Sequence, residues 1–186
     1  SLNNREIFSL TVSGSNLFAG SISFGVYVST NNGSSWTQTS LNNRDIFSLS
    51  ANGNNIVAGT NNNGVYYSTN NGLNWGPAIL SVVGNDRNHV SAEYTGTGPY
   101  ANYVYAGITP GNFGRSTDAG LTWTTTFTPS NTQPGCYIAV GPNDTINGGC
   151  VIYVTNTGST SSRTYNFYRS TDGGSTFTLR SSQNYV

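Results

Sequence analysis

The chain has 186 residues, with seven arginines, no lysine and seven acidic residues, so its formal net charge is zero. A nucleic-acid-binding protein would present clustered Lys and Arg to the phosphates, and no such cluster is present, so we expect no nucleic-acid partner. No apolar run approaches the roughly 20 residues that cross a bilayer, so we expect no membrane insertion.

The polar surface must be built from Asn, Ser, Thr and Gly instead of charge. Such a surface is typical of proteins outside the cell, and the N-x-S/T sequences at Asn32 and Asn143 are candidate glycosylation sites. Methionine is absent, so we expect Ser1 to follow processing or to begin a fragment. The composition therefore favours a secreted or cell-surface protein.

One sequence unit recurs four times along the chain, and the first two copies are the most similar. Ser1–Leu10 returns as Ser40–Leu49 at an offset of 39 residues, and two diverged copies follow. The copies occupy approximately residues 1–39, 40–79, 80–128 and 129–186. We therefore expect a single repeat domain, or a segment of one, over residues 1–186.

Each copy alternates apolar and polar residues in short runs that Gly and Asn interrupt, which is typical of half-buried strands. We expect four strands per copy, A to D, and no helix. In the first copy these strands are Ile7–Val12, Asn16–Gly20, Gly25–Ser29 and Ser35–Thr39.

The longer third and fourth copies are expected to place their extra residues mainly in the A–B turn. The glycines that align at this turn are Gly14, Gly53, Gly96 and Gly141. Copy four also carries an expected insertion between strands B and C, from Asn156 to Tyr165.

The strongest marker of the repeat is an octet between strands C and D, first seen as Ser29-Thr-Asn-Asn-Gly-Ser-Ser-Trp36. Its third residue can accept backbone N–H groups in an Asx-turn, its Gly supplies a positive φ, and its aromatic residue fills a hydrophobic gap. We therefore assign a structural role to the octet residues Ser29, Asn31, Gly33, Trp36, Ser68, Asn70, Gly72, Trp75, Ser116, Asp118, Gly120, Trp123, Ser170, Asp172, Gly174 and Phe177.

These octets resemble the Asp box, S-x-D-x-G-x-T-W, also called the BNR repeat. The resemblance covers almost the whole chain, although Asn31 and Asn70 replace the preferred Asp and Phe177 replaces Trp. It implies an all-β fold, a β-propeller of four-stranded antiparallel blades, as in sialidases, sortilin-type receptors and xyloglucan-active glycoside hydrolases. Because the box is a fold marker away from the active face in these proteins, it names no function.

The sequence offers little to a hydrolase. A glycosidase needs two carboxylates on one face, and Asp86 with Glu93 is the only suggestive local pair, for which solvated loop residues are the simpler interpretation. The sialidase resemblance would imply an Arg-Ile-Pro sequence, and none is present. We assign no catalytic residue.

Metal and cofactor sites are also not expected. His89 is the sole histidine, and Cys136 and Cys150 are the only thiols, so no zinc cluster or Ser-His-Asp triad is supported. His89 aligns with strand residues Ile7 and Ile46, which favours a partly buried position. Strand pairing would place the two cysteines at opposite ends of one hairpin, so we expect no disulfide, although lone cysteine pairs in extracellular chains usually do bridge.

Three arginines, Arg5, Arg44 and Arg87, each precede strand A at the same distance from the A–B glycine. Strand A lines the channel of a propeller, so these residues would form an arc at one channel mouth, on the face that also carries Arg163 and Tyr165. Converging guanidinium groups suit a carboxylate or sulfate. The simpler alternative, which we favour, is that each arginine packs on a neighbouring blade or pairs with Glu6 or Asp45.

The favoured function is an extracellular, non-catalytic propeller that binds a glycan or a protein or takes part in assembly. The alternative is a segment of a sialidase-like or other glycoside hydrolase whose catalytic residues lie partly outside this chain. Four blades are the small extreme for a propeller. We therefore expect either a larger ring or self-association that covers the terminal blade edges.

Overall fold

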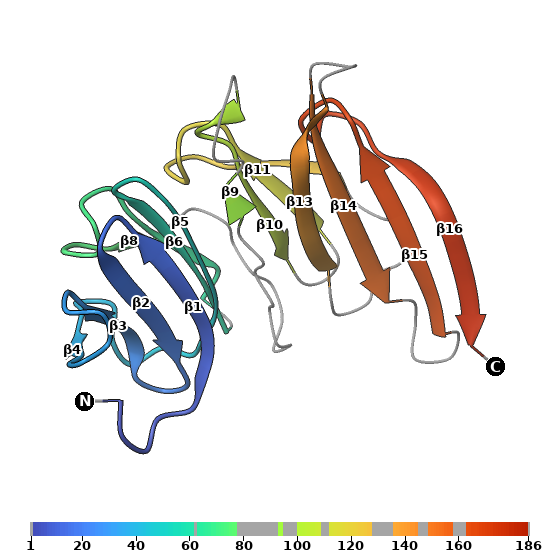
Figure 1. Cartoon of the computed structure of the whole chain (residues 1–186). Coiled ribbons are helices and arrows are strands. Elements are labelled where there is room, and N and C mark those ends of the chain that lie inside the picture. The colour runs from blue at the N-terminus through green and yellow to red at the C-terminus, as the bar shows by residue number, and fades with distance from the viewer. Residues whose placement is uncertain are drawn as a thin grey trace.

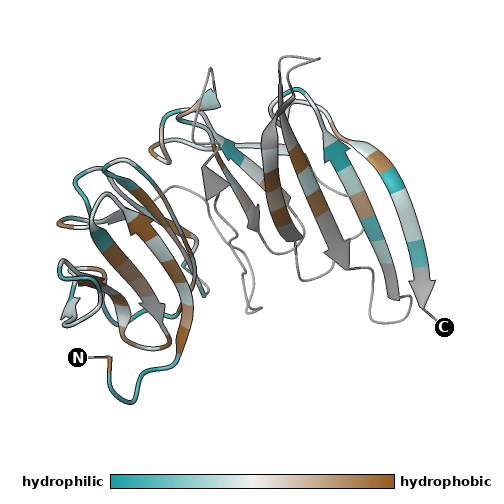
Figure 2. Ribbon diagram, in the orientation of Figure 1, coloured by the Kyte–Doolittle hydropathy of each residue, from teal (hydrophilic) through white to brown (hydrophobic). Residues whose placement is uncertain are grey.

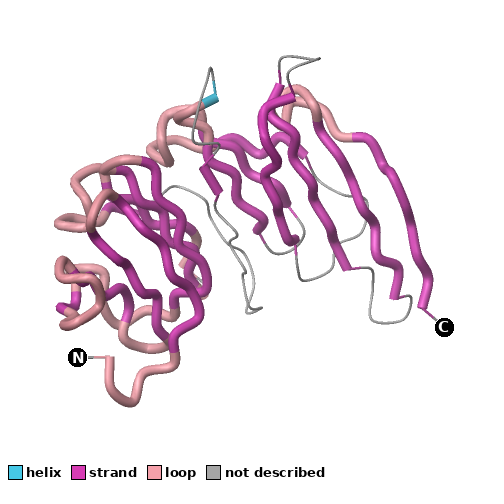
Figure 3. The backbone as a smooth tube through the Cα atoms, in the orientation of Figure 1, coloured by secondary structure: helices cyan, strands magenta, loops and turns pink. Residues whose placement is uncertain are grey.

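The structure is a computed structural model, and it describes residues 2–61, 63–77, 93–94, 100–108, 112–127, 136–144, 149–157 and 163–185. These residues form β-strands joined by turns, and this part of the chain contains no α-helix; the short segment that Figure 3 colours as helix is a 3-10 conformation at Tyr100. Within it, no helix is long and apolar enough to cross a membrane.

The strands are β1 (Ile7–Ser13), β2 (Asn16–Ser21), β3 (Gly25–Ser29), β4 (Thr37–Gln38), β5 (Ile46–Asn52), β6 (Asn55–Thr60), β7 (Val65–Ser68), β8 (Gly76–Pro77), β9 (Glu93–Tyr94), β10 (Val104–Ile108), β11 (Asn112–Ser116), β12 (Thr124–Phe127), β13 (Cys136–Asp144), β14 (Gly149–Thr157), β15 (Arg163–Ser170) and β16 (Thr178–Tyr185). They form four four-stranded antiparallel sheets, each built from four consecutive strands. We call these sheets blades 1 to 4.

The first three strands of blade 1 agree with the sequence prediction to within one residue. The fourth strand, β4, is shorter than expected because the octet turn extends to Trp36, whose indole Nε1 donates to the carbonyl of Gly33 at 3.1 Å. Blade 2 repeats the pairing of blade 1, including an irregularity near the start of its first strand.

The four blades follow one another along an arc. The first strand of each blade contacts the first strand of the next, from β1 to β5 to β9 to β13, so these strands form a continuous inner row. Figure 1 shows the arc open, with blade 1 at one end and blade 4 at the other. This is the blade arrangement that the repeat predicted.

The cores lie where the faces of neighbouring blades meet. Between blades 1 and 2, Phe18 and Val26 pack with Ile46, Leu49 and other residues of blade 2. Between blades 3 and 4, the core residues are Tyr105, Phe113, Ile138, Ile152, Val154 and Tyr168. Figure 2 shows the hydrophobic positions alternating with polar ones along the strands of these blades.

Blade 4 corrects two details of the sequence prediction. Gly141 lies inside β13 and not at the A–B turn, because the hairpin continues until Asp144 pairs with Gly149. The expected B–C insertion is partly strand, since Thr157 pairs with Tyr165 and Asn156 with Asn166. The extra residues of copy four therefore lengthen its strands, and a longer antiparallel ladder satisfies their backbone groups.

The two cysteines lie in the β13–β14 hairpin. Cys136 is opposite Asn156, whereas Cys150 is opposite Asn143. Cys136 is thus displaced by six positions along β14, from 150 to 156, or about 20 Å at ~3.3 Å per residue. A disulfide needs Cα atoms within about 7 Å.

We predict that neither cysteine is bridged to the other within one chain. The intact mass of the monomer should be the same with and without reductant, and both thiols should react with an alkylating reagent in denaturant without added reductant. If reduction adds two hydrogen atoms to the mass of the monomer, the two cysteines are bridged and the β13–β14 register is wrong.

Candidate functional site

The octet turns share one hydrogen-bond pattern, and we call them boxes. In box 1, the hydroxyl oxygen of Ser29 accepts the N–H of Gly33 at 2.9 Å, and the same hydroxyl donates to Asn31 Oδ1 at 3.0 Å. Asn31 Oδ1 also accepts the N–H of Ser35 at 2.8 Å. The same bonds recur in boxes 2, 3 and 4, and the first serine of every box is at most 2% exposed.

The structure confirms the positive φ expected at the box glycine, with values of 84°, 78°, 95° and 76° at Gly33, Gly72, Gly120 and Gly174. The preceding residue is also left-handed in every box, including Ala119 at 61°, which the sequence analysis missed.

The box glycine also contacts the preceding blade, a role that the sequence analysis did not identify. A Cβ on Gly72 would lie 2.7 Å from the Phe18 ring of blade 1. A Cβ on Gly120 would lie 2.8 Å from Val57 of blade 2, and one on Gly174 would lie 3.1 Å from Tyr105 of blade 3. The box is therefore the joint between blades as well as the hairpin turn.

Boxes 3 and 4 carry a carboxylate at the third position. Partial burial opposes ionisation of Asp118, but the hydroxyl and N–H of Thr122 donate to it at 2.6 and 2.8 Å and outweigh that effect. The pKa of Asp118 therefore lies below its ordinary value of 3.8. Thr176 acts in the same way on Asp172, and the pKa of Asp172 is also lowered.

Arg5 and Arg44 lie immediately before β1 and β5, at the end of each blade opposite the boxes. The Arg5 guanidinium lies 3.4 Å from the centroid of the Phe24 ring, and that of Arg44 lies 6.0 Å from the Tyr66 ring. Each arginine thus meets an aromatic ring of its own blade. The Nε atoms of both are buried without a hydrogen-bond partner.

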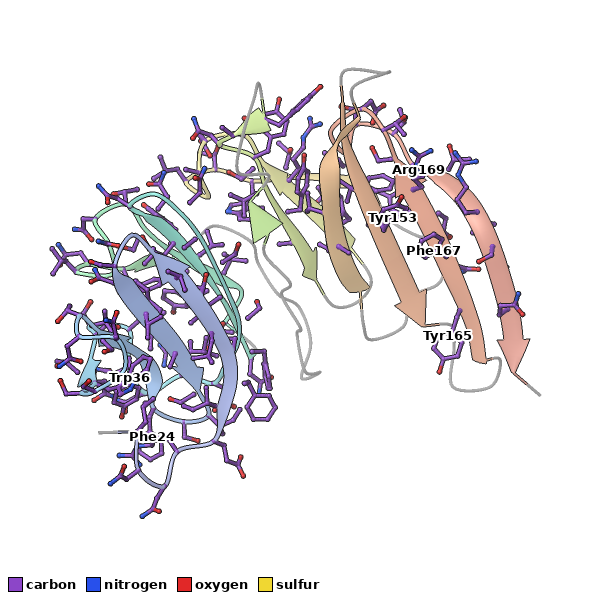
Figure 4. All side chains as sticks on the ribbon, in the orientation of Figure 1. Phe24, Trp36, Tyr153, Tyr165, Phe167 and Arg169 are labelled. Carbon is purple, nitrogen blue, oxygen red and sulfur yellow. The ribbon has the colours of Figure 1, made fainter. Side chains whose placement is uncertain are left out.

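The other predicted ligand-binding residues are spread along the same rim. Tyr165 in β15 is 44% exposed, and Figure 4 places it at the opposite end of the arc from Phe24. The backbone of Arg163 begins β15. Arg87 and His89 lie outside the described residues. The structure therefore places Arg5 and Tyr165 at opposite ends of the arc, and not in one pocket.

Most carboxylates with described side chains have structural partners. Asp45 accepts the N–H of Ser23 in blade 1 at 2.8 Å and the amide of Asn61 in blade 2 at 3.1 Å, so it ties two blades together. Asp118 and Asp172 hold their boxes. Glu6 is exposed. Asp86 lies outside the described residues, so the Asp86–Glu93 pair is untested.

An open hollow of about 360 Å³ lies beside box 1, lined by Leu2, Asn3, Gly33, Ser34, Ser35 and Trp36. The candidate glycosylation site Asn32 is exposed in the same turn, and Asn143 lies in β13. Among the described residues, no group of three His, Cys, Asp or Glu side chains is placed to hold a metal ion.

No family model and no curated protein matches the chain. Solved structures do match its fold. An ancestral GH74 enzyme is 22% identical with a TM-score of 0.70, over 94% of this chain and 25% of that one. The NanB sialidase from Streptococcus pneumoniae is 15% identical with a TM-score of 0.57, over 90% and 28%. YCF48 bound to D1 peptide is 12% identical with a TM-score of 0.54, over 94% and 82%.

These proteins are β-propellers, so the comparisons confirm the all-β propeller fold that the repeat predicted. The chain spans about a quarter of the length of the GH74 enzyme and of the sialidase. At such identities the likeness establishes the fold alone.

The box joint makes a prediction that separates two glycines with similar φ. Gly72→Ala should lower the free energy of unfolding by about 1–3 kcal/mol more than Gly33→Ala, because only Gly72 meets the Phe18 ring. A Cβ on Gly33 has its nearest neighbour at 3.6 Å. Urea unfolding of the dilute monomer measures both, and equal losses would contradict the joint.

The lowered pKa values predict a pH dependence. A carboxyl whose pKa is depressed by folding stabilises the protein above its unfolded pKa, and this contribution is lost as the pH falls through the folded pKa. Asp118→Asn with Asp172→Asn should therefore flatten the decline of melting temperature between about pH 5 and pH 2. Asn31 and Asn70 show that a box accepts Asn. An unchanged decline in the double variant would contradict this role.

Proposed function

We propose that the chain is an extracellular, non-catalytic propeller module that binds an acidic group, a carboxylate or sulfate, on a glycan or a protein. The observation that carries the proposal is the rim formed by Arg5 and Arg44. Their guanidinium groups contact aromatic rings, while nearby Asp45 accepts hydrogen bonds from Ser23 and Asn61.

The ligand chemistry follows from that environment. An aromatic ring holds a guanidinium through cation–π attraction, worth about 0.5–1 kcal/mol at an exposed site, and this attraction uses none of its N–H groups. Arg44 Nη1 also donates to the carbonyl of Asn43 at 3.0 Å. Two parallel N–H donors match the two oxygens of a carboxylate or sulfate. The rim therefore favours an anionic ligand.

The use of the carboxylates supports a role without catalysis. Hydrolysis of a glycoside needs a carboxylate pair at a fixed separation, free to exchange protons. Asp118, Asp172 and Asp45 are each held by hydrogen bonds that maintain the fold. The lysine-free polar surface supports a location outside the cell.

A segment of a glycoside hydrolase is the second candidate, and the likeness to a GH74 enzyme and a sialidase favours it. In that case the chain would supply a few blades of a larger ring, with catalytic residues contributed from elsewhere. The two candidates differ in whether the complete protein releases a glycan or only binds it.

The test combines binding with turnover. The chain should bind sialylated or sulfated glycans on an array more strongly than neutral ones and should release no product from the same glycans in solution. Arg44→Ala should weaken binding by about tenfold or more at nearly unchanged melting temperature, because its contact with Tyr66 is loose at 6.0 Å. Arg180→Ala, on the exposed strand β16, is the matched control.

Two results would contradict the proposal. Product release by the purified chain would favour the hydrolase candidate. Unchanged binding with a lowered melting temperature in Arg44→Ala would show that the rim arginines only pack the blades.

A further inference from the structure

The joint between blades 3 and 4 shows what a complete contact looks like. Tyr105 and Phe113 stack with ring centroids 5.6 Å apart and an interplanar angle of 20°, and both are fully buried. Gly174 of the next box lies against both rings, since a Cβ there would be 3.1 Å from Tyr105 and 3.2 Å from Phe113. The following box packs against this pair of rings.

Polar contacts complete this joint. The Tyr105 hydroxyl donates to the carbonyl of Gly173 at 3.2 Å. Arg115 donates through Nη1 to the same carbonyl at 3.1 Å and to the Ser175 hydroxyl at 2.8 Å. A Tyr, a Phe and an Arg on one blade thus bind residues four to six of the next box.

Blade 4 carries the same three residue types at the same places. Tyr153 and Phe167 stack at 5.4 Å with an angle of 19°, and Arg169 follows Phe167 by two residues as Arg115 follows Phe113. The registers are equivalent, because Ile152 pairs with Ser170 as Val104 pairs with Ser116. Figure 4 shows the three side chains close together on β14 and β15.

This second pair of rings, Tyr153 and Phe167, faces away from blade 3. Ile152, Val154 and Tyr168, which alternate with Tyr153 and Phe167 along the strands, pack into the core between blades 3 and 4. Tyr153 and Phe167 are only partly buried, in contrast to the fully buried Tyr105 and Phe113. We call this surface, formed by Tyr153, Phe167 and Arg169, the trailing face of blade 4.

Blade 1 presents the complementary surface at the other end of the arc. Leu10 is 67% exposed, whereas its equivalents, Leu49 in blade 2 and Ile138 in blade 4, are 9% and 7% exposed. Val12, two residues further along β1, is 60% exposed. The hollow beside Gly33 and Trp36 lies at the position where the other boxes meet a preceding blade. We call Leu10, Val12 and box 1 the leading face of blade 1.

Box 1 matches the trailing face in detail. Its sixth residue is Ser34, the equivalent of the Ser175 that Arg115 binds. Boxes 2 and 3 have leucine at this place, and the blades before them have Val28 and Tyr67 at the position of Arg115. The backbone also matches, since Asn32 and Gly33 have φ values of 54° and 84° where Gly173 and Gly174 have 65° and 76°. An arginine at this position of one blade is thus matched by a serine at the sixth position of the next box. Arg169 of blade 4 would be matched in the same way by Ser34 of box 1.

We infer that the trailing face of blade 4 docks on the leading face of blade 1 of a second copy of this chain. Tyr153 and Phe167 of one copy cover Gly33 of the other, and Arg169 donates to the Asn32 carbonyl and the Ser34 hydroxyl. Blades 1 and 4 of one copy lie at opposite ends of its arc (Figure 1), so a second copy makes this contact.

The expected assembly is a head-to-tail ring of two copies. Two copies of four blades supply eight, and propellers typically have four to eight blades. Head-to-tail contacts close into rings when the rotation between copies allows it. The contact buries sheet faces, and a glycan on Asn32 would prevent it.

The first test is the mass of the unglycosylated chain in solution. Sedimentation at about 100 µM should give twice the 19.7 kDa of one chain or a larger multiple. A monomer at this concentration would overturn the inference. Ser34→Arg, at an exposed residue, should raise the dissociation constant at least tenfold, while Gln183→Arg on β16 should leave it unchanged.

The second test distinguishes this contact from any other self-association. Arg169→Glu and Ser34→Arg should each weaken assembly, and the two changes combined in one chain should restore it, because they create an ion pair across the same contact. Leu10→Glu disrupts the leading face. Because Leu10 is 67% exposed, this substitution should leave the monomer folded, so it tests the contact even if Arg169→Glu prevents folding. An equimolar mixture of Leu10→Glu and Arg169→Glu chains should form dimers through their one intact pair of faces. Full assembly of Leu10→Glu alone, or no rescue in either experiment, would overturn the inference.

Discussion

The close approach of each box glycine to the preceding blade is the constraint on which the rest of the structure depends. The buried box serine satisfies the glycine N–H, which fixes the turn in a conformation that only a residue with positive φ can hold. The glycine backbone then lies so close to a side chain of the previous blade that no Cβ fits at Gly72 or Gly120. One octet therefore sets both the hairpin and the spacing of the blades.

Similar repeat units in different places show the effect of that joint. Leu10 and Leu49 are equivalent residues of two nearly identical copies, yet only Leu49 is buried, because blade 1 packs against it. Gly33 and Gly72 differ in the same way. The exposed residues at the ends of the arc are thus interior positions of the repeat that lack a neighbour in one copy of the chain, and burying them is favourable by about 25 cal/mol per Å² of apolar surface.

The repeat made most of the fold predictable from sequence. Period-two alternation predicted β1 to β3, and the octet predicted the turn between the third and fourth strands of each blade, because both are local patterns. The strand extensions of blade 4 were not predictable, since Gly141 and Asn156 also suit turns and only the longer ladder decides their state. The sequence contains the match between Arg115 and Ser175 as a correlation between consecutive copies. The contact between them could be inferred only from the structure, which shows which faces of the blades meet.

A double-mutant cycle between Phe18 and Gly72 tests the joint most directly. Replacing the Phe18 ring with the smaller leucine side chain in Phe18→Leu makes room at the position that a Cβ on residue 72 would occupy. Gly72→Ala should lower the free energy of unfolding by less in the Phe18→Leu background than in the original chain, with a coupling energy of about 0.5–3 kcal/mol in equilibrium unfolding. Additive effects of the two substitutions would contradict the joint.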